Sequence, residues 1–169
     1  KYWSLAQKKF SNVSTNFVFK THAANLRYKN NVYTTKENTL GLIYLVRDPR
    51  GIVPSYSYHL NLSHEEILNS IINKKNITLN PKKNICVPLS CWETHIKSWE
   101  ILNVPKLFIR YEDLVNDTKG VINKCINFLE SLGLNFSYNL SKIKNIYIST
   151  KFDNLKLIEE KSNHTIGKH

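Results

Sequence analysis

Residues 40–55 read LGLIYLVRDPRGIVPS, an apolar run that gives way to charged and polar residues. A continuous apolar run of this kind is typical of a strand buried on both faces, in a parallel sheet covered by helices. Residues 106–111, KLFIRY, predict a second strand of the same kind. Residues 17–19, FVF, predict a third, short strand, because both residue types favour β structure.

Helical patterns alternate with these strands. Residues 63–66, SHEE, form a capping box that begins one helix, and residues 89–102 predict another. A further helix begins near residues 117–118, carries one apolar stripe and ends at Gly133, a residue suited to the position after a helix C-terminus. No repeat or linker interrupts the pattern, so residues 1–169 predict a single domain with an α/β fold, a parallel sheet flanked by helices.

The composition limits the classes of partner. The chain carries 24 Lys and Arg against 13 Asp and Glu, a net charge of +11, which predicts an anionic partner. The lysines are scattered, so we interpret them as a solvated surface and rank nucleic-acid binding last. No apolar run approaches the roughly 18 residues of a membrane span. The cysteines show no ligand spacing, which predicts neither zinc nor disulfides.

Polar residues follow each predicted strand. In a parallel sheet, ligands bind at the carboxyl ends of the strands. Residues 20–22, KTH, follow the predicted strand at 17–19, Arg47 follows the apolar run that begins at residue 40, and residues 111–114, YEDL, follow the strand that begins at residue 106. A guanidinium at a strand end can grip a phosphate, and the hydroxyl of Ser55 on the next helix can reach the same anion, as can the helix N-terminus.

Each of these residues has a simpler interpretation. Arg47 can pair with Asp48 or Glu112 on the surface, and a lone histidine such as His22 is often structural. Trp92, His95 and Trp99 lie three, four and seven residues apart, on one helix face. We interpret that face as core packing around a hydrogen-bonded histidine.

Several motifs together resemble the sulfotransferase family, in its cytosolic-type bacterial branch, over nearly the whole chain. They occur in the family's order. They are KTH at 20–22, IYLVRDPR at 43–50, SY at 55–56, SCWETHIKSW at 90–99, IRYEDL at 109–114 and STKFDNL at 149–155. The resemblance implies a P-loop NTPase-like α/β fold, a cytoplasmic location and no metal.

The resemblance also implies roles for individual residues. The donor is 3′-phosphoadenosine 5′-phosphosulfate (PAPS), the product is adenosine 3′,5′-bisphosphate (PAP), and the acceptor is a small molecule or glycan with a hydroxyl or amine. The implied donor-binding residues are Arg47 and Ser55 at the 3′-phosphate, Tyr111 at the adenine, and Thr150 and Phe152 near the base. His22 matches the general base, and Lys20 matches a lysine that offsets negative charge at the reacting centre.

The resemblance is incomplete at both ends. No Gly-containing, Lys-bearing phosphosulfate loop precedes Phe17, and Gly167-Lys168 stands where the family has an Arg-Lys-Gly segment. We therefore expect the sequence to be a fragment of a complete enzyme. Pro54 also departs from the family pattern, and we expect it in a first helical turn.

Other functions stay open. The first is a non-catalytic nucleotide-binding homologue, which the absence of the loop favours. The second is a P-loop-type kinase, which needs a GxxxxGK[ST] loop and a carboxylate for Mg²⁺. A nucleic-acid-binding protein, with binding that falls steeply as salt rises, is the last.

Overall fold

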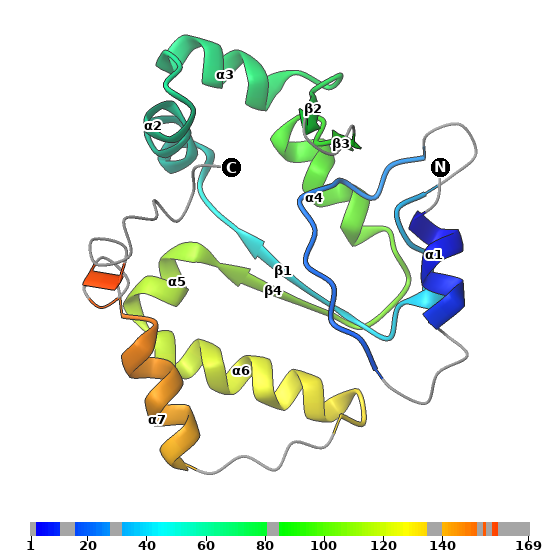
Figure 1. Cartoon of the computed structure of the whole chain (residues 1–169), viewed down its shortest axis with the longest axis vertical. Coiled ribbons are helices and arrows are strands. Elements are labelled where there is room, and N and C mark those ends of the chain that lie inside the picture. Colours follow the sequence, from blue (N-terminus) through cyan, green and yellow to red (C-terminus); the bar gives the residue numbers. More distant parts are fainter. Residues whose placement is uncertain are drawn as a thin grey trace.

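A computed structural model describes residues 3–10, 16–27, 32–80, 85–134, 140–151, 154, 157 and 158. In these parts, helices alternate with short strands (Figure 1). The elements in chain order are α1 (Trp3–Phe10), η1 (Lys36–Asn38), β1 (Leu42–Val46), α2 (Pro49–Leu60), α3 (His64–Ile72), β2 (Ile77–Asn80), β3 (Ile85–Pro88), α4 (Trp92–Glu100), β4 (Lys106–Arg110), α5 (Tyr111–Asn116), α6 (Thr118–Ser131) and α7 (Leu140–Ser149).

The two long apolar runs of the sequence form a parallel pair, β1 and β4. The register places Leu42 opposite Lys106 and Val46 opposite Arg110, so both strands end at the same edge. In Figure 1, α4 and α6 lie on opposite sides of this pair. The predicted α/β arrangement with a parallel sheet is therefore present, and α2 and α5 begin directly beyond its carboxyl edge.

The third predicted strand, Phe17-Val18-Phe19, is wrong. Residues 16–20 are extended but have no strand assignment, and the described part of the chain offers them no strand to pair with. Val18 is 94% exposed. The apolar side chains instead form a small aromatic cluster, in which the rings of Phe17 and Phe19 lie 5.0 and 5.9 Å from that of Phe10.

Burial of β1 on both faces is also wrong within the described residues. Ile43 is 43% exposed and Leu45 is 53% exposed. The partner of Leu45 in β4 is Ile109, which is only 7% exposed. The difference arises because α6 packs against β4. An apolar run therefore identified the strand but not which neighbour would cover it.

A second, antiparallel pair was not anticipated. Strands β2 and β3 pair with Ile77 opposite Pro88, in a stretch rich in Lys and Asn. Each strand has only four residues, so any period-two signal is too short to identify it.

The predicted start of α3 and end of α6 are confirmed, whereas α4 covers only Trp92–Glu100 of the predicted 89–102. Ser63 and Glu66 form the reciprocal capping box of α3, which buries Ile67 to 1% exposure. After α6, Gly133 adopts a φ of +80°, and its N–H bonds to the carbonyl of Glu130. The N–H of Leu134 bonds to the carbonyl of Leu129, which completes a Schellman motif.

Helix α2 contains Pro54 at a later position than expected. Asp48 caps the helix by accepting a hydrogen bond from the Arg50 N–H, and Pro54 lies inside the helix rather than in its first turn. Because proline has no N–H, the carbonyl of Arg50 loses its helical donor.

No helix in the described part of the chain is long and apolar enough to cross a membrane.

Candidate functional site

An open cavity of about 1420 Å³ runs along β1 and reaches the carboxyl ends of β1 and β4. It brings together most of the residues that the sequence singled out, from three separate segments of the chain. The predicted site residues that line it are Lys20, His22, Arg47, Ser55 and Tyr111. Convergence therefore occurs at the predicted edge of the sheet, although residues 17–19 form no strand.

Arg47 is the first residue after β1, and its side chain is held over an aromatic ring. The guanidinium carbon lies 4.5 Å from the centroid of the Tyr111 ring, a cation–π distance. Gly51, one helical turn later, leaves room for this arrangement. A Cβ at that position would lie 3.3 Å from Arg47 Nε, a close contact.

The surface ion pairs considered for Arg47 do not form. Asp48 instead bonds Arg50, with 2.6 Å between the carboxylate and Nη2. The hydrogen bonds from Arg50 hold the pKa of Asp48 down to about 2. Glu112 accepts from the Asp48 N–H and lies 3.7 Å from Arg110. Within the described parts of the chain, no acidic group or hydrogen-bond acceptor engages the Arg47 guanidinium.

Helix α2 presents one face to the cavity. Ile52, Ser55 and Tyr56 line it, with the i, i+3, i+4 spacing of a single helix face. The exposed hydroxyl of Ser55 thus opens onto the same space as Arg47. Asp48 already caps the N-terminus of α2. Its carboxylate therefore lies where the sequence had predicted that this terminus would bind an anion.

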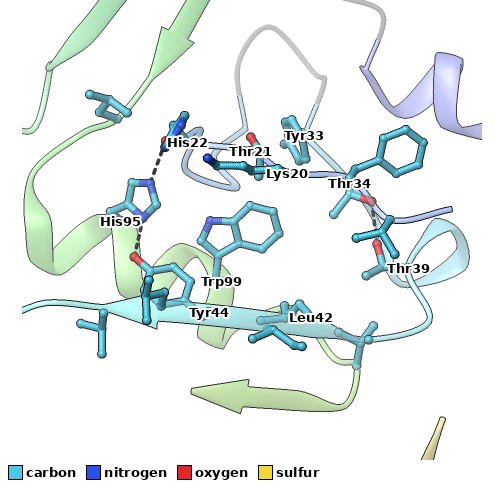
Figure 2. A pocket seen from close by; sticks show the side chains of 18 of the residues that line it. Lys20, Thr21, His22, Tyr33, Thr34, Thr39, Leu42, Tyr44, His95 and Trp99 are labelled. Atoms are coloured by element: carbon cyan, nitrogen blue, oxygen red, sulfur yellow. Dashed lines mark hydrogen bonds between the residues drawn. The ribbon is translucent and has the colours of Figure 1, made fainter. Parts of the chain in front are cut away.

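The segment that carries Lys20 and His22 follows the opposite side of the cavity, where both side chains are exposed (Figure 2). Helix α4, rather than a strand ladder, anchors this segment. Trp99 Nε1 donates to the carbonyl of Ala23 at 3.1 Å, and the N–H of Asn25 donates to Ser98 Oγ at 2.9 Å. The backbone beside His22 is therefore fixed by side chains of a helix.

The Trp92, His95 and Trp99 face does more than pack. Trp99 is 6% exposed, as expected of a core residue. However, Trp92 Nε1 donates to the carbonyl of Arg47 at 3.1 Å, so the same helix holds the backbone of both candidate segments. The regular spacing of these residues was the available signal, but a sequence does not show which carbonyls their nitrogens will meet.

His95 lies between β1 and the His22 segment. Its Nδ1 is 2.6 Å from the Tyr44 hydroxyl and its Nε2 is 3.1 Å from the His22 carbonyl (Figure 2). Burial lowers the pKa of His95 and raises the pKa of Tyr44 to about 12. Both side chains are thus neutral near pH 7.

The two remaining predicted nucleotide contacts are Thr150 and Phe152. Thr150 follows α7 and its hydroxyl donates to the carbonyl of Ile146 at 2.8 Å. It does not line the cavity. Phe152 lies outside the described residues.

In the part of the chain that is described, no group of three or more His, Cys, Asp or Glu residues is arranged to hold a metal ion.

Comparison with known proteins identifies relatives over this same region. The family model described as "Sulfotransferase domain" matches residues 4–169. Rat "Sulfotransferase 1E1" is 34% identical over 98 residues, which cover 56% of this chain and 32% of the rat protein. Rabbit "Amine sulfotransferase" is 27% identical over 149 residues, covering 85% of this chain and 46% of the rabbit protein. The chain thus spans less than half the length of these relatives.

A solved structure supports the fold. The crystal structure of mouse sulfotransferase SULT7A1 complexed with PAP superimposes with a TM-score of 0.59 at 24% identity, covering 88% of this chain and 50% of the mouse chain. Similarity at this level of identity establishes a shared architecture. The P-loop NTPase-like α/β fold predicted from the motifs is therefore confirmed.

Proposed function

We propose, since this chain belongs to the sulfotransferase domain family, that it serves the transfer of a sulfuryl group from PAPS to an acceptor hydroxyl or amine. One observation carries the proposal above the others. The Arg47 guanidinium is stacked on Tyr111, engaged by no acceptor in the described residues, and open to the cavity that His22 also lines. A guanidinium in this state is prepared to receive an anion.

Arg47 and Ser55 are proposed to hold the 3′-phosphate of the donor. The guanidinium carries five N–H donors in a planar fork, which suits two phosphate oxygens at once. The Ser55 hydroxyl opens onto the same cavity and adds a third donor. The ring of Tyr111, which supports the guanidinium from below, is also proposed to contact the adenine. Thr150 and Phe152 are proposed only on the motif that contains them.

His22 is proposed as the general base. PAPS supplies the sulfuryl group, and the chain's own residues orient the acceptor and take its proton. A neutral imidazole nitrogen can accept the proton as the acceptor oxygen or nitrogen forms its bond to sulfur. Lys20, exposed on the same segment, is proposed to offset the negative charge that grows on the departing phosphate.

The partners are proposed at the level of chemical class. The mouse structure that shares this fold was solved with PAP, which supports a nucleotide sulfate as donor. The printed names of the relatives, "Sulfotransferase 1E1" and "Amine sulfotransferase", do not select one acceptor, so we propose a small molecule or glycan bearing a hydroxyl or amine. A cytoplasmic location is proposed on the resemblance to the cytosolic-type family.

Calorimetric titration with PAP tests the nucleotide site. Arg47→Ala should weaken binding about 10- to 150-fold, the effect of losing hydrogen bonds to a charged group worth about 1.5–3 kcal/mol. Arg50→Ala is the matched control, because that neighbouring guanidinium is committed to Asp48 and its side chain is 90% exposed. Equal losses in the two variants, or no binding by the folded wild type, would contradict the assignment.

Transfer of labelled sulfate from PAPS to a panel of hydroxyl and amine acceptors tests the chemistry. His22→Ala should abolish transfer while it leaves the dissociation constant of PAP unchanged. Binding of PAP without turnover by the wild type would instead identify a non-catalytic nucleotide-binding homologue.

A further inference from the structure

We propose that His95 is a positioning residue for His22, and that a hydrogen bond from Tyr44 stabilises the tautomer in which His95 works. This inference rests on the proposed role of His22 as general base. It goes beyond that role because it assigns functions to His95, which its helical spacing had suggested only as packing, and to Tyr44, for which the sequence analysis predicted no role. The geometry that carries it is the chain of hydrogen bonds from the Tyr44 hydroxyl through the His95 ring to the His22 carbonyl.

The direction of each hydrogen bond follows from the chemistry of its partners. The His22 carbonyl can only accept, so His95 Nε2, 3.1 Å away, must carry a proton and donate it. In a neutral imidazole the other nitrogen is then an acceptor. Nδ1 therefore accepts from the Tyr44 hydroxyl at 2.6 Å. The carbonyl thus selects the Nε2–H tautomer, and the phenol stabilises it by donating to the unprotonated Nδ1.

The protonation behaviour of both groups is consistent with this arrangement. Burial is the largest cause of the lowered pKa of His95, so the ring stays neutral near pH 7. Burial likewise raises the pKa of Tyr44 to about 12, so the phenol keeps the proton that it donates. Tyr44 is further held by the ring of Phe108, 5.3 Å away on the neighbouring strand. The chain of hydrogen bonds thus begins at a side chain of the paired strand β1.

The His22 segment needs such a support. Residues 16–22 belong to no strand pair in the described part of the chain, so no backbone ladder fixes where His22 stands. Among the described residues, His95 provides the hydrogen bond to His22 itself, through the His22 carbonyl. Trp99 and Ser98 hold the residues that follow, Ala23 and Asn25. Loss of His95 therefore frees the base more than it frees the rest of the segment.

Two amide substitutions separate the contacts of His95. The side-chain nitrogen of Gln reaches about as far as Nε2, so His95→Gln keeps a donor for the His22 carbonyl. The shorter Asn reaches only the level of Nδ1, so His95→Asn loses that donor. Ser98→Ala is the matched control, since it removes a neighbouring bond from the same helix to the same segment, at Asn25.

Nitrogen-15 spectra of histidine-labelled wild-type protein and these variants test the proposal without any need for turnover. The wild type should show His95 with a protonated Nε2 and an unprotonated, hydrogen-bonded Nδ1, and Tyr44→Phe should remove the hydrogen-bond shift at Nδ1. The ring signals of His22 should move in His95→Asn and return toward the wild type in His95→Gln. Ser98→Ala should lower the melting temperature and leave those signals in place.

Three results would overturn the proposal: a proton on Nδ1 in the wild type, His22 signals in His95→Asn that match the wild type, or an equal change in Ser98→Ala. If His95→Asn does not fold, Tyr44→Phe and His95→Gln still decide the tautomer and the contact. In an active enzyme, His95→Asn should lower kcat about 100-fold, as a small displacement of a catalytic group does, with PAP affinity unchanged and partial recovery in His95→Gln. A wild type that binds PAP but transfers nothing defeats the proposed function alone, because the spectra still decide the role of His95.

Discussion

The guanidinium of Arg47 lies 4.5 Å from the centroid of the Tyr111 ring, and this contact joins the ends of two neighbouring strands. Arg47 follows β1 and Tyr111 follows β4, which run parallel in register. The aromatic face holds the cation in place without using any of its N–H donors. The donors therefore stay available for an anion.

Substitution of Tyr111 should weaken nucleotide binding through Arg47. Tyr111→Leu removes the cation–π contact, worth about 0.5–2 kcal/mol, so the dissociation constant for PAP should rise about 2- to 30-fold. Tyr111→Phe retains the ring and should bind within a factor of two or so of the wild type. Calorimetry measures both. A loss in Tyr111→Phe as large as in Tyr111→Leu would show that the hydroxyl, and not the ring, matters.

Gly51→Ala should separate binding from stability. The new Cβ would lie 3.3 Å from Arg47 Nε, so the guanidinium must shift from its position. We expect PAP binding to weaken about five-fold, roughly 1 kcal/mol. Alanine favours a helix over glycine by about 1 kcal/mol, so the free energy of unfolding should not fall. A parallel fall in stability and affinity would argue for general damage to α2 instead.

Truncation of Ile67 should destabilise the fold, because it is the largest side chain that is almost fully buried among the described residues, at 1% exposure. Ile67→Ala should cost about 2–5 kcal/mol of unfolding free energy, from lost burial and the cavity left behind. Leu68→Ala is the control, since Leu68 is 49% exposed on the same helix. It should cost less than about 1 kcal/mol. Urea denaturation measures both, and similar costs would contradict the packing of α3.

Acid should remove the contribution of Asp48 to stability. Hydrogen bonds from Arg50 lower the pKa of Asp48 from 3.8 to about 2 in the folded chain. A carboxyl with a depressed pKa stabilises the fold at pH values above its unfolded pKa, and that stability is lost as the pH falls through the folded pKa. The difference in melting temperature between the wild type and Asp48→Asn should therefore shrink from about pH 5 to pH 2.

The same comparison in an Arg50→Ala background provides the control. Without the guanidinium, the largest cause of the shift is gone, so the pH dependence of the Asp48→Asn difference should become small. A difference that stays constant with pH in the wild-type background would show that Asp48 acts only as a neutral cap of α2.

The sequence-based predictions succeeded where a signal is local. The capping box at Ser63, the C-terminal glycine at Gly133 and the two apolar runs each act through neighbouring residues. The order of the motifs identified the family and its fold. Arg47 and Tyr111 meet at one edge because β1 and β4 run parallel, whereas Lys20 and His22 reach the cavity on a segment that α4 anchors.

Other features depend on neighbours that lie far apart in the chain, and only the tertiary structure decided them. A strand needs a partner for its backbone groups, and the stretch from Phe17 to Phe19 has none among the described residues. Arg47 had acidic residues beside it, yet Arg50 and Arg110 engage them, and the Arg47 guanidinium has no acidic partner among the described residues. His95 resembled a packing residue because its spacing shows a helix face and not its hydrogen-bond partners. The sequence by itself determined the family, the strands β1 and β4 and the capped helix ends, since these follow from local patterns. Long-range packing determined which donors are already satisfied and which remain for a ligand, because a hydrogen bond or ion pair depends on distances between segments that no local pattern specifies.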